Sequence, residues 1–200
     1  MLFHFHYWTP YVEEMENFYK RLGFTVHQRI GKYNGEFKHF NPPLTVDDIR
    51  EKNILFRIIE MKRGNINITF GYGKRPTFDH IGFFVSKDEH DEICKKSEMI
   101  QWKTKIDERR TFLYTPYGFS IELQTHIDAL GNDGNNDAIH RIELMTLKPG
   151  LEKDLSFLFG NRASSVQTKL GDHVKIEKVQ IRGLKEKRAI DMNGVELLHV

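Results

Sequence analysis

The first third of the chain passes from strand-like to helix-like spacing and back. Apolar and polar residues alternate over residues 2–8, as in a half-buried strand, and the next apolar positions recur at helical spacing until Gly23. Strand-like runs follow at 24–30, 54–61 and 66–70, the last two as a hairpin. The pattern predicts one βαβββ module.

The same order of elements returns in the second third. A strand is predicted at 80–85, a helix at 88–100, and three further strands within 102–124. Each module alone would leave an apolar sheet face in water, whereas two tandem copies can pack together. We therefore predict an α+β fold in which paired βαβββ modules, residues 1–127, form a cup-shaped mixed sheet.

The composition changes after the second module. Residues 128–138 are rich in Gly, Asn and Asp, which is typical of a flexible linker. Residues 139–200 predict a small C-terminal α+β extension that includes a strong hairpin turn at Asn193-Gly194. A third, degenerate copy of the module is an open interpretation of this extension, because Glu196 follows a glycine much as Glu122 does.

Composition and charge limit the function classes. The 30 Lys and Arg against 28 Asp and Glu give a formal charge of +2, so we expect no nucleic-acid partner. No run is long enough for a membrane span, and the single cysteine without a signal peptide predicts a cytoplasmic location. The 10 His and 15 Phe favour a small-molecule partner, because aromatic side chains line pockets and histidine binds metals. A homodimer is left open.

Three of the predicted strands place metal-binding side chain types on one face. Strand alternation puts His4 and His6 on the same face, and it turns His80 and Glu122 away from their apolar neighbours. A helix packed on the apolar faces would leave these side chains pointing into the cup. Because a carboxylate among apolar residues needs a cation or a proton, we predict a divalent metal held by His80, Glu122 and either His4 or His6.

Two imidazoles and one carboxylate leave several coordination positions of a metal open. Such a set suits Fe(II) or Mn(II) and lets a substrate bind through two adjacent oxygens. The metal could act as a Lewis acid or bring a substrate and O₂ together. His6 and Tyr114 are the candidates for catalytic proton transfer.

Three short motifs together resemble the vicinal oxygen chelate superfamily, the group of glyoxalase I, bleomycin- and fosfomycin-resistance proteins and extradiol dioxygenases. They are Phe18-Tyr19-Lys20-Arg21-Leu22-Gly23-Phe24 downstream of His4, Phe78-Asp79-His80-Ile81-Gly82-Phe83, and Thr115-Pro116-Tyr117-Gly118 followed by Ile121-Glu122-Leu123. The resemblance covers about residues 1–127. It implies the paired-module fold, a divalent metal such as Fe, Mn, Ni or Zn, and His4 rather than His6 as the first ligand.

One strand departs from the superfamily members that have a fourth protein ligand. Their first module supplies a carboxylate from its last strand, whereas residues 65–70 contain none. The resemblance therefore implies a metal-dependent enzyme of the dioxygenase, transferase or lyase/isomerase type acting on a small oxygenated molecule, and makes glyoxalase I activity less expected. The alternative is a metal-free drug-binding protein of the bleomycin-resistance type, although those relatives lack the metal-binding trio.

The segment 33–53 is longer than a minimal connection between strands. It contains Phe37 and His39, which would suit a lid over an apolar ligand, and a surface excursion with a short helix is the alternative. Arg57 and Tyr72 are further candidates for the lining of the cup.

Overall fold

The computed structural model describes residues 1–131 and 134–200. The first module consists of β1 (Leu2–Thr9), α1 (Val12–Arg21), β2 (Thr25–Tyr33), β3 (Glu36–Phe40), α2 (Val46–Glu51), β4 (Leu55–Arg63) and β5 (Ile66–Tyr72). The second consists of β6 (Thr77–Phe84), α3 (Lys87–Met99), β7 (Lys103–Ile106), β8 (Thr111–Tyr114) and β9 (Ser120–Gln124).

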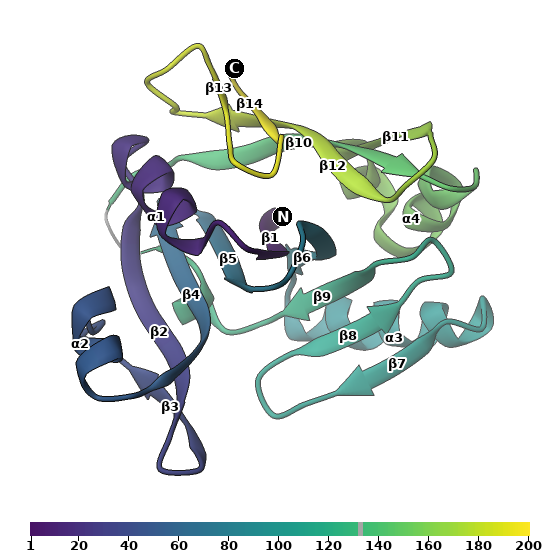
Figure 1. Cartoon of the computed structure of the whole chain (residues 1–200). Coiled ribbons are helices and arrows are strands. Elements are labelled where there is room, and N and C mark those ends of the chain that lie inside the picture. The colour runs from purple at the N-terminus through teal and green to yellow at the C-terminus, as the bar shows by residue number, and fades with distance from the viewer. Residues whose placement is uncertain (132–133) are drawn as a thin grey trace.

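The two modules form one nine-stranded sheet in the order β3-β2-β4-β5-β1-β6-β9-β8-β7 (Figure 1). In each module the first strand pairs in parallel with the last, β1 with β5 and β6 with β9. The antiparallel pairing of β1 with β6 joins the modules at the centre of the sheet. The prediction of paired βαβββ modules in a cup-shaped mixed sheet is confirmed.

The central strand β1 separates the core from the cup. Phe5 and Tyr7 belong to the main hydrophobic cluster, whereas His4 and His6, one position away, line a cavity on the opposite face. Helix α1 covers the core face because Met15, Phe18 and Tyr19 are buried on one of its sides. The histidines are thus placed by the period of two along the strand.

The C-terminal extension forms a second sheet in the order β11-β10-β12-β14-β13. Its elements are β10 (Ala138–Thr146), α4 (Leu151–Phe159), β11 (Val166–Leu170), β12 (Lys175–Arg182), β13 (Arg188–Ile190) and β14 (Glu196–His199), with short 3₁₀ helices at Ile127–Ala129 and Gly160–Ser165. It shares the strand–helix–strand opening of the modules, but its second strand pairs directly with its first. Its strand order therefore differs from that of β1–β5 and β6–β9.

The second sheet covers the side of the cup opposite the cavity (Figure 1). The rings of Phe83 and Phe159 stack at 4.2 Å, and the backbone N–H of Ile176 donates to the hydroxyl of Tyr7 at 2.9 Å. One hydrophobic cluster includes residues of both sheets. The extension thus completes the core behind the strands that carry the histidines.

The predicted linker 128–138 is anchored where the structure describes it, and its residues 132 and 133 lie outside the described residues. The N–H of Asn65 donates to the carbonyl of Asp137 at 2.8 Å, and the guanidinium of Arg63 binds the Asp137 carboxylate at 2.6 Å. Strand β10 begins at Ala138, one residue before the predicted start.

Two strands were not predicted from the sequence, β3 and β11. Strand β3 is largely exposed, so it lacks the alternation of apolar residues that marks a half-buried strand. A turn at Asn34-Gly35, both with positive φ, connects it to β2. The predicted turn at Asn193-Gly194 does join β13 to β14. No described helix has the length and apolarity that crossing a membrane requires.

Candidate metal centre

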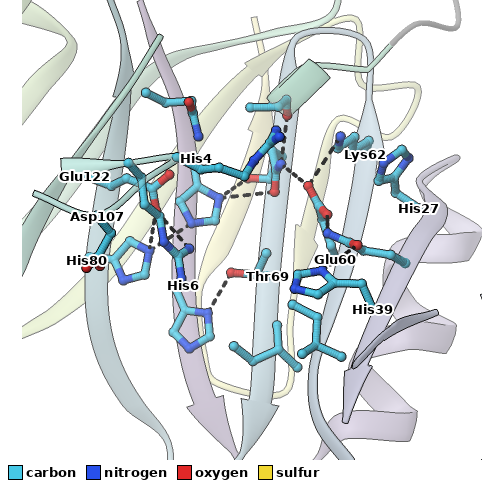
Figure 2. A pocket seen from close by; sticks show the side chains of 18 of the residues that line it. His4, His6, His27, His39, Glu60, Lys62, Thr69, His80, Asp107 and Glu122 are labelled. Carbon is cyan, nitrogen blue, oxygen red and sulfur yellow. Dashed lines mark hydrogen bonds and ion pairs between the residues drawn. The ribbon is translucent and has the colours of Figure 1, made fainter. Parts of the chain in front are cut away.

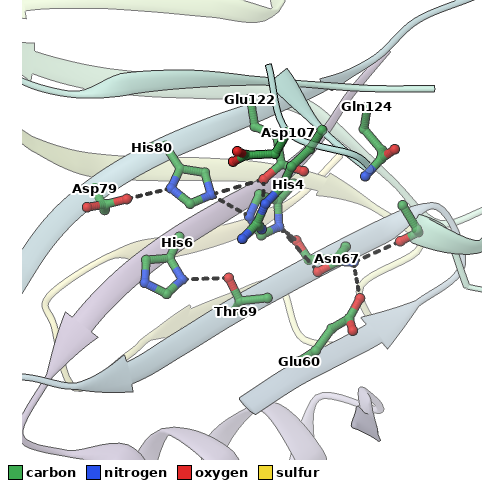
Figure 3. Close-up of polar contacts among 12 residues, drawn as sticks. His4, His6, Glu60, Asn67, Thr69, Asp79, His80, Asp107, Glu122 and Gln124 are labelled. Atoms are coloured by element: carbon green, nitrogen blue, oxygen red, sulfur yellow. Dashed lines mark hydrogen bonds and ion pairs between the residues drawn. The ribbon is translucent and has the colours of Figure 1, made fainter. Parts of the chain in front are cut away.

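Three buried side chains from adjacent strands converge in the cup. His4 on β1, His80 on β6 and Glu122 on β9 are 4–5% exposed, and one ligand atom from each lies within 4.8 Å of the others. The Nε2 atoms of the two histidines are 3.0 Å apart, and Nε2 of His80 is 3.4 Å from a carboxylate oxygen of Glu122 (Figure 3). The structure therefore brings together the trio that the sequence singled out, with His4 rather than His6 in it.

The spacing of these atoms fits a common divalent ion. Two ligand atoms about 2.1 Å from one ion and at right angles to each other are about 3.0 Å apart. The observed separations of 3.0 Å and 3.4 Å are close to that value. Two imidazole nitrogens and a carboxylate oxygen are also ligands that iron, manganese and zinc accept.

Each histidine is oriented by a partner on its other ring nitrogen. Nδ1 of His80 lies 2.6 Å from the Asp79 carboxylate, and Nδ1 of His4 lies 2.9 Å from the backbone carbonyl of Asn67. When Nδ1 carries the proton and donates it, the Nε2 lone pair is free to bind a metal. The two partners thus favour the tautomer in which Nδ1 carries the proton and the Nε2 lone pair of each histidine is free.

The electrostatics of the trio favour an ionised Glu122 carboxylate. Burial lowers the pKa of His4 to about 4 although Glu122 opposes this. Burial also acts against a charged His80, but hydrogen bonds to Asp79 and Glu122 outweigh it and raise the pKa of His80. For Glu122 burial is outweighed by the neighbouring imidazoles and by Arg110, which lower its pKa to about 2. The carboxylate is therefore ionised and can bind a cation.

His6 lies beside the trio and has an unused nitrogen. Its ring stacks on His80 with the ring centres 5.1 Å apart, and its Nδ1 lies 2.6 Å from the hydroxyl of Thr69. Its Nε2 is buried and has no hydrogen-bond partner among the described residues. Burial, and then the nearby charge of His80, hold the pKa of His6 well below its usual range. A neutral imidazole with a free Nε2 can accept a proton.

The trio opens onto a cavity of about 970 Å³. Figure 2 shows Glu60 and Lys62 on β4 and His27 and His39 on β2 and β3, across the cavity from the trio. Phe37 and His39 line it, so part of the segment 33–53 forms a wall of the cup. This volume is within the range of small-molecule binding sites.

Other predicted lining residues lie at different distances from the trio. Arg57 lines the cavity, whereas Tyr72 is 63% exposed and lines a separate surface groove. Tyr114 is 46% exposed, and Phe112, two residues earlier on β8, is the residue whose ring contacts His80 at 5.1 Å. The catalytic role of Tyr114 therefore remains a prediction.

The sequence analysis did not single out Asp79, Asn67, Thr69 or Trp8 as site residues. Asp79 directly precedes His80, and an acidic residue beside a candidate ligand was a usable signal. Asn67 and Thr69 face His4 and His6 only because β5 pairs in parallel with β1 in one particular register. No local pattern in the sequence specifies that register.

Solved structures match this chain in fold, although comparisons of its sequence find no relative. No protein-family model matches the chain, and no curated protein matches it. A crystal structure of BphC, a halotolerant catechol dioxygenase, superposes with a TM-score of 0.66 at 10% identity, over 99% of this chain and 85% of that one. The 2,3-dioxygenase LapB from a Pseudomonas species gives 0.66 at 11% identity over 100% and 91%.

Homoprotocatechuate 2,3-dioxygenase from Arthrobacter globiformis gives a TM-score of 0.62 at 10% identity, over 100% of this chain and 79% of that one. These extradiol dioxygenases belong to the vicinal oxygen chelate superfamily. The chain therefore has the fold of that superfamily, as the three sequence motifs implied.

Proposed function

We propose that the protein is a divalent-metal-dependent dioxygenase that binds a small aromatic vicinal diol through its two adjacent oxygens. The observation that carries the proposal is the convergence of His4, His80 and Glu122 on one point of the cavity. A facial set of two imidazoles and one carboxylate is typical of non-haem Fe(II) oxygenases, so iron is proposed ahead of Mn, Ni or Zn. The similarity in fold to catechol dioxygenases supports the dioxygenase reaction.

Five residues would hold the metal or orient its ligands. His4, His80 and Glu122 would hold the metal, and Asp79 and Asn67 would keep both imidazoles in the ligating tautomer. When bound, the metal would supply Lewis-acid binding of the two diol oxygens and, as Fe(II), a site for O₂.

His6 is proposed as the general base. Its Nδ1–H would donate to the hydroxyl of Thr69, which leaves the lone pair of Nε2 to accept a proton from a diol hydroxyl. Its lowered pKa keeps the imidazole neutral, so that the Nε2 lone pair is not already protonated. The apolar rings of Trp8, beside His6, and of Phe112, beside His80, would limit access of water to the reacting oxygens.

A metal-free drug-binding role is not supported. A sequestering pocket has no need of two histidines and a carboxylate whose ligand atoms lie at ion-binding separations. The three solved structures compared above are also dioxygenases rather than drug-binding proteins.

The test begins with the metal content of the untagged protein and its O₂ uptake with catechol after loading with Fe(II) under nitrogen. We expect one metal per chain and O₂ uptake that depends on catechol. His80→Ala should lose both, because it removes one of three ligands. His140→Ala is the matched control, since His140 is exposed on β10 in the second sheet. Absence of stoichiometric metal, or a His80→Ala variant with unchanged metal affinity, would overturn the proposal.

A further inference from the structure

The cup face of β1 carries a third side chain beyond the two histidines, the indole of Trp8. Successive residues on one face of a strand are about 7 Å apart, so Trp8 follows His4 and His6 in a row that leads away from the trio. The ring of His6 meets the indole edge to face, with the ring centres 4.6 Å apart. All three side chains line the cavity.

The position of this indole is specified by its neighbours. Gly71 on β5 pairs with Trp8, and a Cβ atom at Gly71 would lie only 2.5 Å from Cζ3 of the indole. The missing side chain therefore lets the indole lie against the backbone of β5. On its other side the indole N–H donates to the Asp79 carboxylate at 3.1 Å, the same group that orients His80. Asp79 thereby links the position of the Trp8 indole to that of the His80 imidazole.

Arg57 on β4 completes this part of the cavity. Its guanidinium carbon lies 4.2 Å from the centre of the Trp8 ring, a close cation–π contact. The other Lys and Arg side chains of the cavity have acidic partners, Lys62 with Glu60, Arg109 with Asp128 and Arg110 with Glu122. Among the described residues Arg57 has no carboxylate within 4.0 Å, and Glu108 lies on the β7–β8 loop of the other module.

We propose that Trp8 and Arg57 form a subsite for a carboxylate carried by the substrate. The inference rests on the proposed function and narrows its substrate to an aromatic diol with an acidic side chain. The diol would bind at the trio, the ring would lie along His6 and Trp8, and the carboxylate would meet Arg57. The span from His4 to Trp8 is about 13 Å along the strand, which suits a ring with a chain of two or three carbons.

The chemistry of Arg57 fits a carboxylate better than another group. A guanidinium presents a planar pair of N–H donors that matches two carboxylate oxygens, and stacking on an aromatic ring holds that plane in place. A neutral group at the same point would leave these donors facing water. The subsite would therefore discriminate by charge and by geometry.

The test compares two ligands that differ in one charge. Calorimetry under nitrogen, with the Fe(II)-loaded protein, would measure binding of 3-(3,4-dihydroxyphenyl)propanoate and of its methyl ester. We expect the acid to bind about tenfold more tightly, and the preference to fall with added salt because the subsite is open to solvent. Arg57→Gln should remove the preference by lowering the affinity for the acid to about that for the ester, and the metal content of the variant would show whether the metal centre is intact.

Arg75→Gln is the matched control, because Arg75 is exposed on the β5–β6 connection and does not line the cavity. It should keep the tenfold preference. Equal binding of acid and ester by the unaltered protein, or an undiminished preference in Arg57→Gln, would overturn the subsite and leave the proposed function standing. Failure of the protein to bind metal or either diol would overturn both.

Discussion

The two modules have the same strand order but contribute different chemistry at equivalent positions. His4 pairs with Asn67 in the first module, and His80 pairs with Ser120 in the second. Two residues further along each pair of parallel strands, His6 faces Thr69 between β1 and β5, and Gly82 faces Glu122 between β6 and β9. Thr69 is therefore the first-module counterpart of Glu122.

By the same equivalence between the modules, His6 in the first module corresponds to Gly82 in the second. A Cβ atom at Gly82 would lie 2.8 Å from Cβ of His4, so the second module must leave this position empty for the first histidine to fit. The first module instead carries an imidazole there, stacked on His80. In our proposal the second module supplies the anionic ligand, and the first supplies the groups that we assign to the substrate. Three sets of substitutions would compare the two modules, in order of decreasing expected effect.

Restoring a carboxylate in the first module should have the largest effect. In Thr69→Glu the new side chain would occupy the position equivalent to Glu122 and take a fourth coordination site. Of six sites only two would then be left, so a bound diol would leave none for O₂. We expect metal binding to strengthen and catechol-dependent O₂ uptake to fall on the order of a hundredfold, measured by chelator competition and with an oxygen electrode. Thr69→Val removes the hydroxyl without adding a ligand, and it should spare metal binding. Unchanged O₂ uptake in Thr69→Glu would contradict the equivalence of the two positions.

The partners of the two histidines provide the next comparison, since His80 is held by a carboxylate and His4 by a backbone carbonyl. Asp79→Asn should weaken metal binding about 10- to 100-fold, because a neutral amide orients the imidazole less firmly and makes it less basic. Chelator competition would measure the loss. Asp172→Asn is the matched control. Asp172 also directly precedes a histidine that it contacts, His173, but the Asp172 side chain is far more exposed than that of Asp79. Equal effects of the two substitutions would show that Asp79 does not act through His80.

The smallest effects should come from the contacts of each module with the C-terminal sheet. Tyr19 donates to Asp191 at 2.9 Å, and Tyr117 donates to Asp154 at 2.8 Å. Asp191 is only 4% exposed, whereas Asp154 is half-buried. Chemical denaturation should show a loss of about 1–3 kcal/mol for Tyr19→Phe and about 0.5–1.5 kcal/mol for Tyr117→Phe.

These two variants should also differ in their pH dependence. Burial raises the pKa of Asp191 to about 6 in spite of its hydrogen bonds. An acid with a raised pKa in the folded state stabilises the fold at low pH, and this contribution is lost as the pH rises through about 6. Above that pH the buried carboxylate is charged and depends more on the hydroxyl of Tyr19. The cost of Tyr19→Phe should therefore grow between about pH 5 and pH 7, and a constant cost would contradict this account.

Local patterns in the sequence were sufficient for part of the site. Alternation along three strands placed His4, His80 and Glu122 on faces turned away from the core, and the order of elements placed the strands within repeated modules. They left the choice between His4 and His6 open, because both lie on one face of β1. That choice depends on how β1 is aligned with β6, where His4 faces Gly82 and His6 faces His80.

By itself the sequence determined the two modules, the faces of their strands and the candidate ligands His80, Glu122 and one of His4 and His6, because these follow from periodicities of two and of 3.6 residues. Only the tertiary structure decided which side chains meet across strands, such as Thr69 with His6 and Arg57 with Trp8. It also decided that the C-terminal sheet covers the back of the cup. Strand register and the packing of sheets depend on contacts between residues far apart in the chain, and no short pattern specifies them.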